Sequence, residues 1–228
     1  MEKRLVVTRA DEDVAGYTEI THPVLKKYAK KCKADFQILS DCQGLHKHYR
    51  ILQLYDWFAD YDRIMIIDSD VLIRKSCPVL FDVVKKENIA SVFEDRGTRQ
   101  EDRMERIRKA NEKYGDKGWD YGYINTGVAL FPKECKDIFK FDRENDQLYT
   151  TYGYDDVFLG WRIYSNGYSF QELDTRYNFM SMWREPPFNQ SIADAQIIHF
   201  AGKGHWPLIR KDLQIKRLYN LMKHYGEI

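Results

Sequence analysis

The first 70 residues alternate short apolar runs with longer segments of helical periodicity, and this alternation most constrains the fold. Apolar runs at residues 3–9, 35–39 and 63–68 predict buried strands. Between them, residues 17–33 and 49–58 carry apolar side chains at helical spacing. A strand–helix–strand rhythm of this kind is typical of an α/β fold, with a parallel sheet and helices on both of its faces.

Further elements are predicted in the rest of the chain, where the rhythm is looser. They are strands over residues 89–93, 123–131 and 196–200, and helices over residues 98–113, 155–164 and 208–224. Pro23 is expected in the first turn of the helix over residues 17–33. Because no linker, repeat or low-complexity stretch interrupts the chain, we expect residues 1–228 to form one domain. Residues 1–95 would be its nucleotide-binding half and residues 96–228 an irregular second half.

Charge and cysteine content restrict the partners and the compartment. The formal net charge is only +1, so no global basic field exists to hold nucleic acid. No apolar run approaches the ~18 residues of a transmembrane helix, and the N-terminus lacks the apolar core of a signal peptide. The cysteines have no metal-ligand spacing, which predicts free thiols at positions 32, 42, 77 and 135. We therefore expect a soluble cytoplasmic protein.

The triplet Asp68-Ser69-Asp70 directly follows the apolar residues Ile64–Ile67, at the end of the strand predicted over residues 63–68. In a parallel α/β sheet, ligands bind beyond the carboxyl ends of the strands, and alternate side chains point to the same side. Asp68 and Asp70 can therefore converge on one point. Two carboxylates suit Mn²⁺ or Mg²⁺, which would neutralise charge on a departing nucleoside diphosphate. The plain alternative is a solvated turn in which an Asp caps a helix.

A second alternative is a phosphatase. Residues 67–72 also resemble the nucleophile motif of the haloacid-dehalogenase phosphatases, in which the first Asp, here Asp68, would attack phosphate. In that family the motif usually ends the first strand of the domain, whereas two strand–helix units precede it here. The downstream Lys and Ser or Thr that such a mechanism requires also lack convincing contexts.

Two later segments place polar residues where a ligand could use them. Asn125 and Gly127 interrupt an apolar run, and they would offer hydrogen bonds and close backbone approach to a sugar, unless they mark a β-bulge. Asp155 and Asp156 stand at a helix start. They could cap that helix, or one of them could face the donor or acceptor sugar.

A third segment ends in a histidine. His199 closes an apolar run and is followed by the basic turn Gly202-Lys203-Gly204. A histidine beside a glycine-rich basic turn suits a metal together with a diphosphate. A histidine standing alone would more often be structural.

Together these motifs resemble the GT-A glycosyltransferases, and within them family 8, the group that includes glycogenin and bacterial galactosyltransferases. The resemblance runs from Val6 to about Trp206. Its marks are Asp68-Ser69-Asp70, Tyr123-Ile124-Asn125-Thr126-Gly127-Val128, Asp155-Asp156 and His199-x-x-Gly202. A small glycosyltransferase domain of large algal viruses is also similar, in segments such as Phe93-Glu94-Asp95 and Asn178-x-Met180-Ser181-Met182. If the chain is viral, its compartment would be the host cytoplasm.

The resemblance implies a mixed, mostly parallel Rossmann-like sheet flanked by helices, and it implies roles for individual residues. Asp68 would contact the ribose or the metal, and Asp70 and His199 would bind the metal. The remaining donor-binding positions would be Thr8, Arg9, Arg50, Ser69, Asn125 and Gly202, together with Lys203 or His205. Family members usually carry a Lys six positions after the metal His, where this chain has His205, so either Lys203 or His205 would contact the diphosphate.

The predicted reaction is attack of an acceptor hydroxyl on the anomeric carbon of a nucleotide sugar, with transfer of a hexose. The working hypothesis is a uridine-nucleotide donor, with Mn²⁺ or Mg²⁺. Asp155 or Asp156 could serve as the base of an inverting enzyme, whereas family 8 indicates retention, which needs no such base. The family's usual Asp-Gln-Asp is replaced here by Asp155-Asp156, so both outcomes stay open. The acceptor, a glycan or another hydroxyl compound, and the oligomeric state stay open too, as does a sugar-binding module without turnover.

Overall fold

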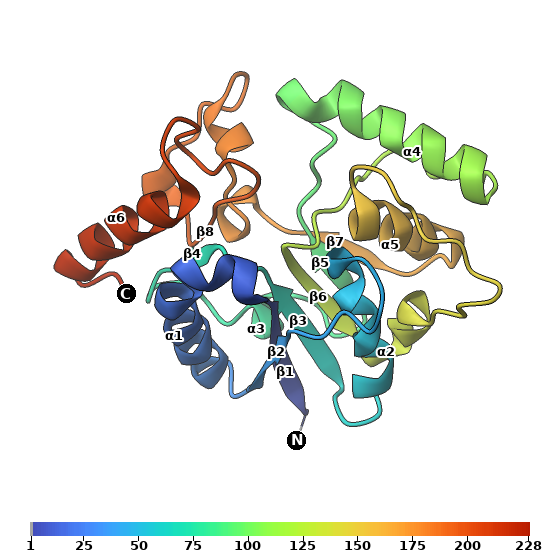
Figure 1. Cartoon of the computed structure of the whole chain (residues 1–228), viewed down its shortest axis with the longest axis horizontal. Helices are drawn as coiled ribbons and strands as arrows, with labels where there is room; N and C mark the ends of the chain where they lie inside the picture. The colour runs from blue at the N-terminus through green and yellow to red at the C-terminus, as the bar shows by residue number, and fades with distance from the viewer. Residues whose placement is uncertain (1) are drawn as a thin grey trace.

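The computed structural model describes residues 2–228, and its centre is a six-stranded sheet with helices on both faces (Figure 1). The strand order is β2-β1-β3-β6-β5-β7. Neighbours β1 and β2, β1 and β3, and β5 and β7 are parallel, whereas β6 is antiparallel to both β3 and β5. The predicted mixed, mostly parallel α/β sheet is therefore confirmed.

The elements have the following bounds. The strands are β1 (Arg4–Arg9), β2 (Asp35–Leu39), β3 (Arg63–Ile67), β4 (Val71–Ile73), β5 (Ile89–Ser91), β6 (Val128–Pro132), β7 (Phe170–Glu172) and β8 (Ile197–His199). The α-helices are α1 (Ala15–Lys31), α2 (Leu54–Trp57), α3 (Leu80–Val83), α4 (Gln100–Tyr114), α5 (Tyr154–Ser165) and α6 (Lys211–His224). Short 3-10 helices cover Glu12–Val14, Lys47–Gln53, Gly97–Arg99, Lys133–Phe139, Thr175–Tyr177, Ser181–Arg184 and Ile192–Asp194.

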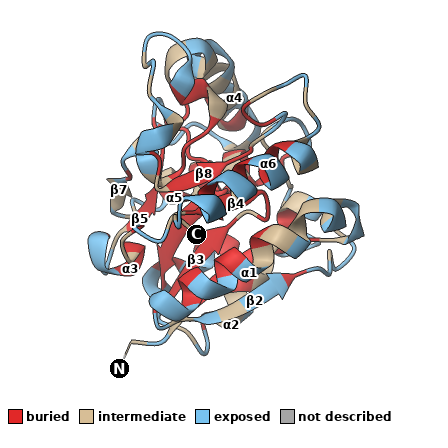
Figure 2. Ribbon diagram, turned by 90° about the vertical axis from the view of Figure 1, so that its left-hand side faces the viewer, coloured by how far each residue is buried: buried red, intermediate tan, exposed pale blue. Residues whose placement is uncertain are grey.

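The sheet separates two apolar cores because its central strands are buried on both faces (Figure 2). Successive residues of a strand point to opposite faces. Val6 of β1 accordingly packs in the core that α1 and α6 cover, and Leu5 and Val7 pack in the core that α2, α4 and α5 cover. A strand buried on both sides must be apolar throughout, which explains why β3 reads as a continuous apolar run.

A two-stranded antiparallel ribbon lies beyond the end of β3. It pairs β4 with β8, so that Val71 stands opposite His199. The amide of Phe200 also donates a hydrogen bond of 2.9 Å to the carbonyl of Asp70. The ribbon therefore holds two of the predicted metal ligands side by side, although they are far apart in the sequence.

Several predicted boundaries are wrong. The strand predicted over residues 123–131 begins only at Val128, because the preceding residues form a turn that joins other parts of the chain through its polar groups. The helix predicted over residues 49–58 is a 3-10 helix followed by the short α2. The short strands β4 and β7 lie outside the predicted elements.

Pro23 lies inside α1 and not in its first turn, because the helix already starts at Ala15. Proline removes one helical N–H, which leaves the carbonyl four residues earlier without its partner. That residue, Glu19, is exposed, so its carbonyl can bind water instead.

Candidate active site

The polar residues gather where several segments reach the same edge of the sheet. The parallel strands β1 and β3 both end there, at Arg9 and Ile67. Because β6 runs in the opposite direction, its first residue Val128 pairs with Ile67 at that edge, and the turn over residues 125–127 lies beside the end of β3. The amide of Asp68 donates a 2.8 Å hydrogen bond to the carbonyl of Gly127, which joins the two turns.

Asp68, Asp70 and His199 form a cluster at this edge. One side-chain atom from each lies within 4.8 Å of the others. The Nε2 atom of His199 is 3.2 Å from Oδ1 of Asp70 and 3.7 Å from Oδ2 of Asp68. Asp70 and His199 are buried, and Asp68 is partly exposed. The structure thus brings together the three residues predicted to bind a metal.

The charges of the cluster depend on one another. Burial disfavours a charged Asp70, but His199 and the ammonium of Lys211 hold the pKa of this carboxyl well below its usual range. The Nζ atom of Lys211 is 2.6 Å from Oδ2 of Asp70. Burial likewise disfavours a charged His199, and Asp70 and Asp68 nevertheless raise the pKa of its ring. The cluster therefore keeps Asp70 ionised, as a cation ligand must be.

The donor set and the space around it fit a divalent cation. His199 Nδ1 lies 2.8 Å from Oδ1 of Asn178, so that Nε2 faces the two carboxylates. Gly127 leaves this face open, because a Cβ atom at that position would lie 2.3 Å from Cε1 of His199 and 3.0 Å from Oδ2 of Asp68. Two carboxylates and one imidazole are ligands that a divalent metal accepts.

Arg9 links this cluster to the start of α5. Its guanidinium is 2.7 Å from Oδ1 of Asp68, and it also pairs with the carboxylate of Asp155. Thr126 completes the contact, since its hydroxyl lies 2.9 Å from Oδ2 of Asp155 and 2.7 Å from Oδ1 of Asp156. Asp155 therefore serves as the partner of a buried arginine.

Asp156 has a different environment. It is partly buried, and its Oδ1 accepts a 2.8 Å hydrogen bond from the amide of Thr126. Burial, the nearby Asp155 and Glu94 raise the pKa of Asp156 to about 8. A carboxyl whose pKa lies near neutrality can exchange a proton during a reaction, as a general base must.

A cleft of about 310 Å³ opens beside the cluster. Its walls come from β1, the Lys47–Gln53 helix, the acidic triplet and the start of α6. Arg50 lines the cleft, and its guanidinium donates a 2.7 Å hydrogen bond to the carboxylate of Asp11. The lining residues are Arg9, Ala10, Asp11, Val14, Tyr17, Lys47, His48, Arg50, Asp68, Ser69, Asp70 and Lys211. Four predicted donor-binding residues, Arg9, Arg50, Asp68 and Ser69, thus line one cleft.

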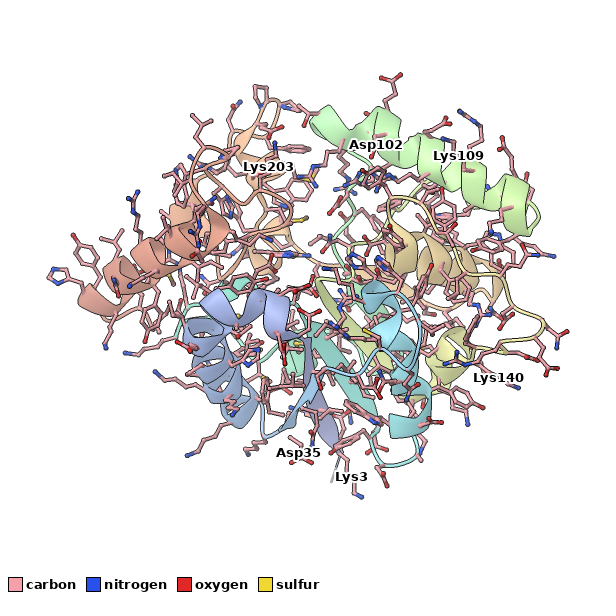
Figure 3. All side chains as sticks on the ribbon, viewed as in Figure 1. Lys3, Asp35, Asp102, Lys109, Lys140 and Lys203 are labelled. Atoms are coloured by element: carbon pink, nitrogen blue, oxygen red, sulfur yellow. The ribbon has the colours of Figure 1, made fainter. Side chains whose placement is uncertain are left out.

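The other predicted donor-binding residues lie outside the walls of this cleft. Thr8 is fully buried in β1, and its hydroxyl has no hydrogen-bond partner among residues 2–228. Lys203 is exposed in the loop between β8 and α6 (Figure 3), and Gly202 precedes it with a φ of +59°. Asn125 is buried among other polar side chains.

His205 is packed within the protein. Its ring stacks on Phe179 with centroids 5.8 Å apart and contacts Phe200 edge-on at 5.3 Å. Burial lowers the pKa of His205 to about 4, so the ring is neutral near pH 7. A neutral ring adds no positive charge for a diphosphate.

Sequence analysis does not identify four residues of the site as binding residues, namely Lys211, Asn178, Tyr17 and Asp11. Lys211 carries no local signal, because it reaches Asp70 only through the packing of α6 against α1 and β4. Tyr17 lies in the cleft close to Ser69 and Asp70, at the start of a helix whose apolar pattern hid it. Asn178 lies in a segment that resembles the viral glycosyltransferase domain, and this resemblance is the one sequence feature that points to it.

Residues 11–205 match the model of glycosyl transferase family 8. The chain belongs to this family. A comparison of this sequence with curated proteins found no match. Membership decides between the two interpretations of Asp68-Ser69-Asp70 in favour of the sugar transferase, so the chain is a glycosyltransferase and the phosphatase alternative falls away.

Solved structures support the same fold. A glycosyltransferase involved in glycosylation of the major capsid of PBCV-1 is 14% identical, with a TM-score of 0.59 over 94% of this chain and 99% of that one. The galactosyltransferase LgtC, solved with donor and acceptor sugar analogues, is 15% identical, with a TM-score of 0.57 over 95% of each chain. GlyE of Streptococcus pneumoniae is 13% identical, with a TM-score of 0.50 over 99% of this chain and 64% of that one. At these identities the likeness establishes the GT-A fold.

Two further predictions concern the whole transferase. The cysteines at positions 32, 42, 77 and 135 are free thiols, as predicted. Within residues 2–228, no helix has both the length and the apolar character that crossing a bilayer requires.

Proposed function

We propose that this transferase moves a hexose from a uridine-nucleotide sugar to an acceptor hydroxyl, and that it requires Mn²⁺ or Mg²⁺. The observation that carries the proposal is the convergence of Asp68, Asp70 and His199 within 4.8 Å beside a cleft that Asp68 and Asp70 line. LgtC, which has the same fold, was solved with donor and acceptor sugar analogues, and this supports a nucleotide-sugar donor here.

The two halves of the chain would divide the work within one domain. Most residues that line the cleft lie within residues 1–95, which we assign to the nucleotide. Residues 96–228 would supply His199 and Lys211 to the metal and diphosphate side and would form the acceptor site. Figure 1 shows α4 and the loops before α6 on opposite sides above the sheet, and we place the acceptor between them.

Asp68, Asp70 and His199 would hold the cation, whose charge stabilises the departing diphosphate. Arg50 and Arg9 line the cleft and would orient the donor through its phosphates and ribose. Ser69 and Thr8 border the same strand ends. We assign the diphosphate contact to Lys211, because its ammonium already lies 2.6 Å from Asp70 and lines the cleft. Neither the exposed Lys203 nor the neutral His205 has that position.

Asp156 is the better placed of the two acidic residues to act as a base. Asp155 is bound to Arg9, which holds it as a counter-ion. Asp156 has a pKa of about 8, so it is ionised and able to accept a proton at alkaline pH. If the reaction inverts the anomeric centre, Asp156 would take the proton of the acceptor hydroxyl. If it retains that centre, the leaving phosphate can take the proton, and Asp156 would then only shape the donor pocket.

Calorimetric titration with UDP, in the presence and absence of Mn²⁺, tests the donor and the metal together. Wild-type protein should bind UDP tightly only with the metal, and Asp70→Asn should lose that dependence. Asp60→Asn, which changes an exposed Asp away from the cleft, is the matched control and should behave as wild type. Metal-independent UDP binding would refute the metal site. Preference for another nucleotide would refute the uridine donor and leave the metal site standing.

A panel of nucleotide sugars with Mn²⁺ then tests turnover. Slow release of free sugar from one donor, without an acceptor, identifies the hexose and excludes a module that only binds sugar. Binding of the donor without release of sugar, with or without candidate acceptors, would contradict the proposed reaction.

A further inference from the structure

A line of buried amide and carboxylate groups runs from the metal cluster to helix α4. We propose that Glu94, Asn125 and Asn178 form a hydrogen-bond relay that decides which ring nitrogen of His199 faces the carboxylates. The three residues are positioning residues, since none of them belongs to the cluster itself. The inference rests on the proposed metal site and adds to it the means by which the chain prepares His199 as a ligand.

The relay is continuous in the structure. The Nδ2 atom of Asn125 donates to Oε1 of Glu94 at 2.6 Å. The Nδ2 atom of Asn178 donates to Oδ1 of Asn125 at 2.8 Å. The Nδ1 atom of His199 then lies 2.8 Å from Oδ1 of Asn178. All four side chains are buried, with exposed fractions of 8% or less, so water does not compete for these bonds.

Two groups fix the direction in which the relay donates. Ionised Glu94 can only accept, so the group of Asn125 that faces it must be the amide NH₂. The backbone N–H of Gly127 can only donate, and it lies 3.0 Å from the other end of the same amide, which must therefore be the oxygen. Both observations give Asn125 one orientation, although they come from different sides of the residue.

The orientation of Asn125 passes along the relay. Its Oδ1 requires a donor, so Asn178 turns its NH₂ toward Asn125 and its oxygen toward His199. That oxygen requires a donor in turn, so the proton of a neutral His199 ring resides on Nδ1. Nε2 is then left with its lone pair, and it is the atom that lies 3.2 Å from Asp70. The ring is thereby prepared to bind a cation.

Two arginines keep Glu94 charged at the far end. Arg103 of α4 donates from Nε at 2.7 Å, and Arg99 contacts the same carboxylate oxygen at 3.3 Å. A buried carboxylate without such partners would take up a proton and could then donate, which would remove the direction of the relay. The polar helix α4, whose charged face otherwise resembles a solvated surface, is thus connected to the metal cluster.

The relay also gives a different role to Asn125. Its NH₂ is bound to Glu94, and its oxygen is bound to both Asn178 and Gly127. The oxygen of Asn125 is thereby used within the protein, and only the second N–H of its amide is left for a ligand.

The test reverses the direction of the relay without touching the cluster. In Glu94→Gln the two arginines would hold the oxygen of the glutamine, so that its NH₂ faces Asn125. Both amides would then turn, at the cost of the hydrogen bond from Gly127, and Nε2 of His199 would be left protonated. We expect a loss of Mn²⁺ affinity of about 10- to 100-fold, the range for groups that orient a metal ligand. Glu172→Gln is the matched control, because Glu172 also pairs with an arginine but lies outside the relay. It should keep wild-type affinity.

The protonated nitrogen of His199 can be read directly from ¹⁵N NMR of the metal-free protein at a pH above the pKa of the ring, because a bound cation would itself force the proton onto Nδ1. Wild type should carry its proton on Nδ1. Asn178→Asp keeps an oxygen opposite Nδ1 and should retain this tautomer, at a cost in melting temperature. Asn178→Leu offers no acceptor and should lose it. The aspartate variant therefore separates positioning from general damage to the core.

Two results would overturn the relay. One is a Glu94→Gln protein that is folded, binds Mn²⁺ as wild type does and keeps the Nδ1 proton. The other is equal metal affinity in Asn178→Leu and Asn178→Asp. Failure of the proposed function gives a different result, in which wild type binds neither Mn²⁺ nor Mg²⁺. Even then, the ¹⁵N NMR spectrum of the His199 ring, recorded at a pH above its pKa, reports whether Glu94→Gln moves the proton from Nδ1 to Nε2.

Discussion

Replacing Gly127 by alanine, the smallest possible change at that position, should strongly disturb the site. Gly127 is the last residue of the turn over residues 125–127, beside the end of β3, and it has a φ that any residue can adopt, so space alone demands glycine there. The Cβ of an alanine would lie 2.3 Å from Cε1 of His199, 2.9 Å from Oδ1 of Asn125 and 3.0 Å from Oδ2 of Asp68. One added carbon would therefore press on two ligands and on the relay at once.

The size of the effect follows from these distances. Carbon atoms in contact prefer a separation of about 3.5–4.0 Å, so the ring of His199 must withdraw by roughly 1 Å. A misplacement of about 1 Å in a catalytic group can lower the rate by about 100-fold. Overpacking of a buried site also costs about 1–3 kcal/mol of stability. We therefore expect Gly127→Ala to fold with a reduced melting temperature and to lose most of its Mn²⁺-dependent UDP binding.

Calorimetric titration of Mn²⁺ and UDP, with thermal unfolding of the same samples, measures both effects. Gly16→Ala is the matched control, because its Cβ would meet nothing closer than 3.8 Å. It should keep binding and should not unfold earlier, since alanine favours a helix more than glycine does. A Gly127→Ala protein with unchanged affinity and melting temperature would show that the cluster can move aside, and would refute the reasoning.

The remaining predictions concern charge. Because burial raises the folded-state pKa of Asp156 to about 8 and the unfolded carboxyl titrates near 4, the native protein binds an extra proton between these values, and its stability should fall as pH rises through them. In Asp156→Asn, the melting temperature should fall less steeply between pH 5 and 9 than in wild type. An equal pH dependence in the two proteins would contradict this role of Asp156. If Asp156 is also the base, activity should rise with pH toward its pKa in wild type only. Lys211→Met should weaken UDP binding about tenfold or more but not Mn²⁺ binding alone, because the ammonium competes for Asp70 and a charge-assisted contact is worth about 1.5–3 kcal/mol. A loss confined to Lys203→Met would instead assign the diphosphate to Lys203.

The front half of the fold could be predicted because its signals are local. The apolar runs of β1, β2 and β3 and the periodicity of α1 are properties of contiguous residues. The antiparallel insertion of β6 between β3 and β5 depends on long-range pairing, for which a single sequence holds no local signal. The sequence predicts a strand where the turn before β6 lies, because Tyr123 and Ile124 are apolar residues like those of a buried strand, and both are in fact buried.

The cluster of Asp68, Asp70 and His199 could be predicted because Asp68 and His199 end apolar runs, Asp70 stands two residues beyond Asp68, and strand ends meet at one edge. Lys211 could not, since its position depends on how α6 packs. Asn125 stands out in the sequence as a polar residue within an apolar run. Its hydrogen-bond partners Glu94 and Asn178 lie far away in the sequence, and no spacing rule connects them to it.

The ribbon of β4 and β8 has a consequence for the order in which the protein matures. Asp70 leaves the ribosome early, and His199 arrives only when most of the chain has been synthesised. Strand β3, which ends just before Asp68, can pair with β1 before that moment, but β4 pairs with β8, and the ion would lack its nitrogen ligand until β8 joins it. Tight metal uptake should therefore mark chains whose synthesis has passed residue 199, and a truncated translation product would carry the acidic triplet without retaining the ion.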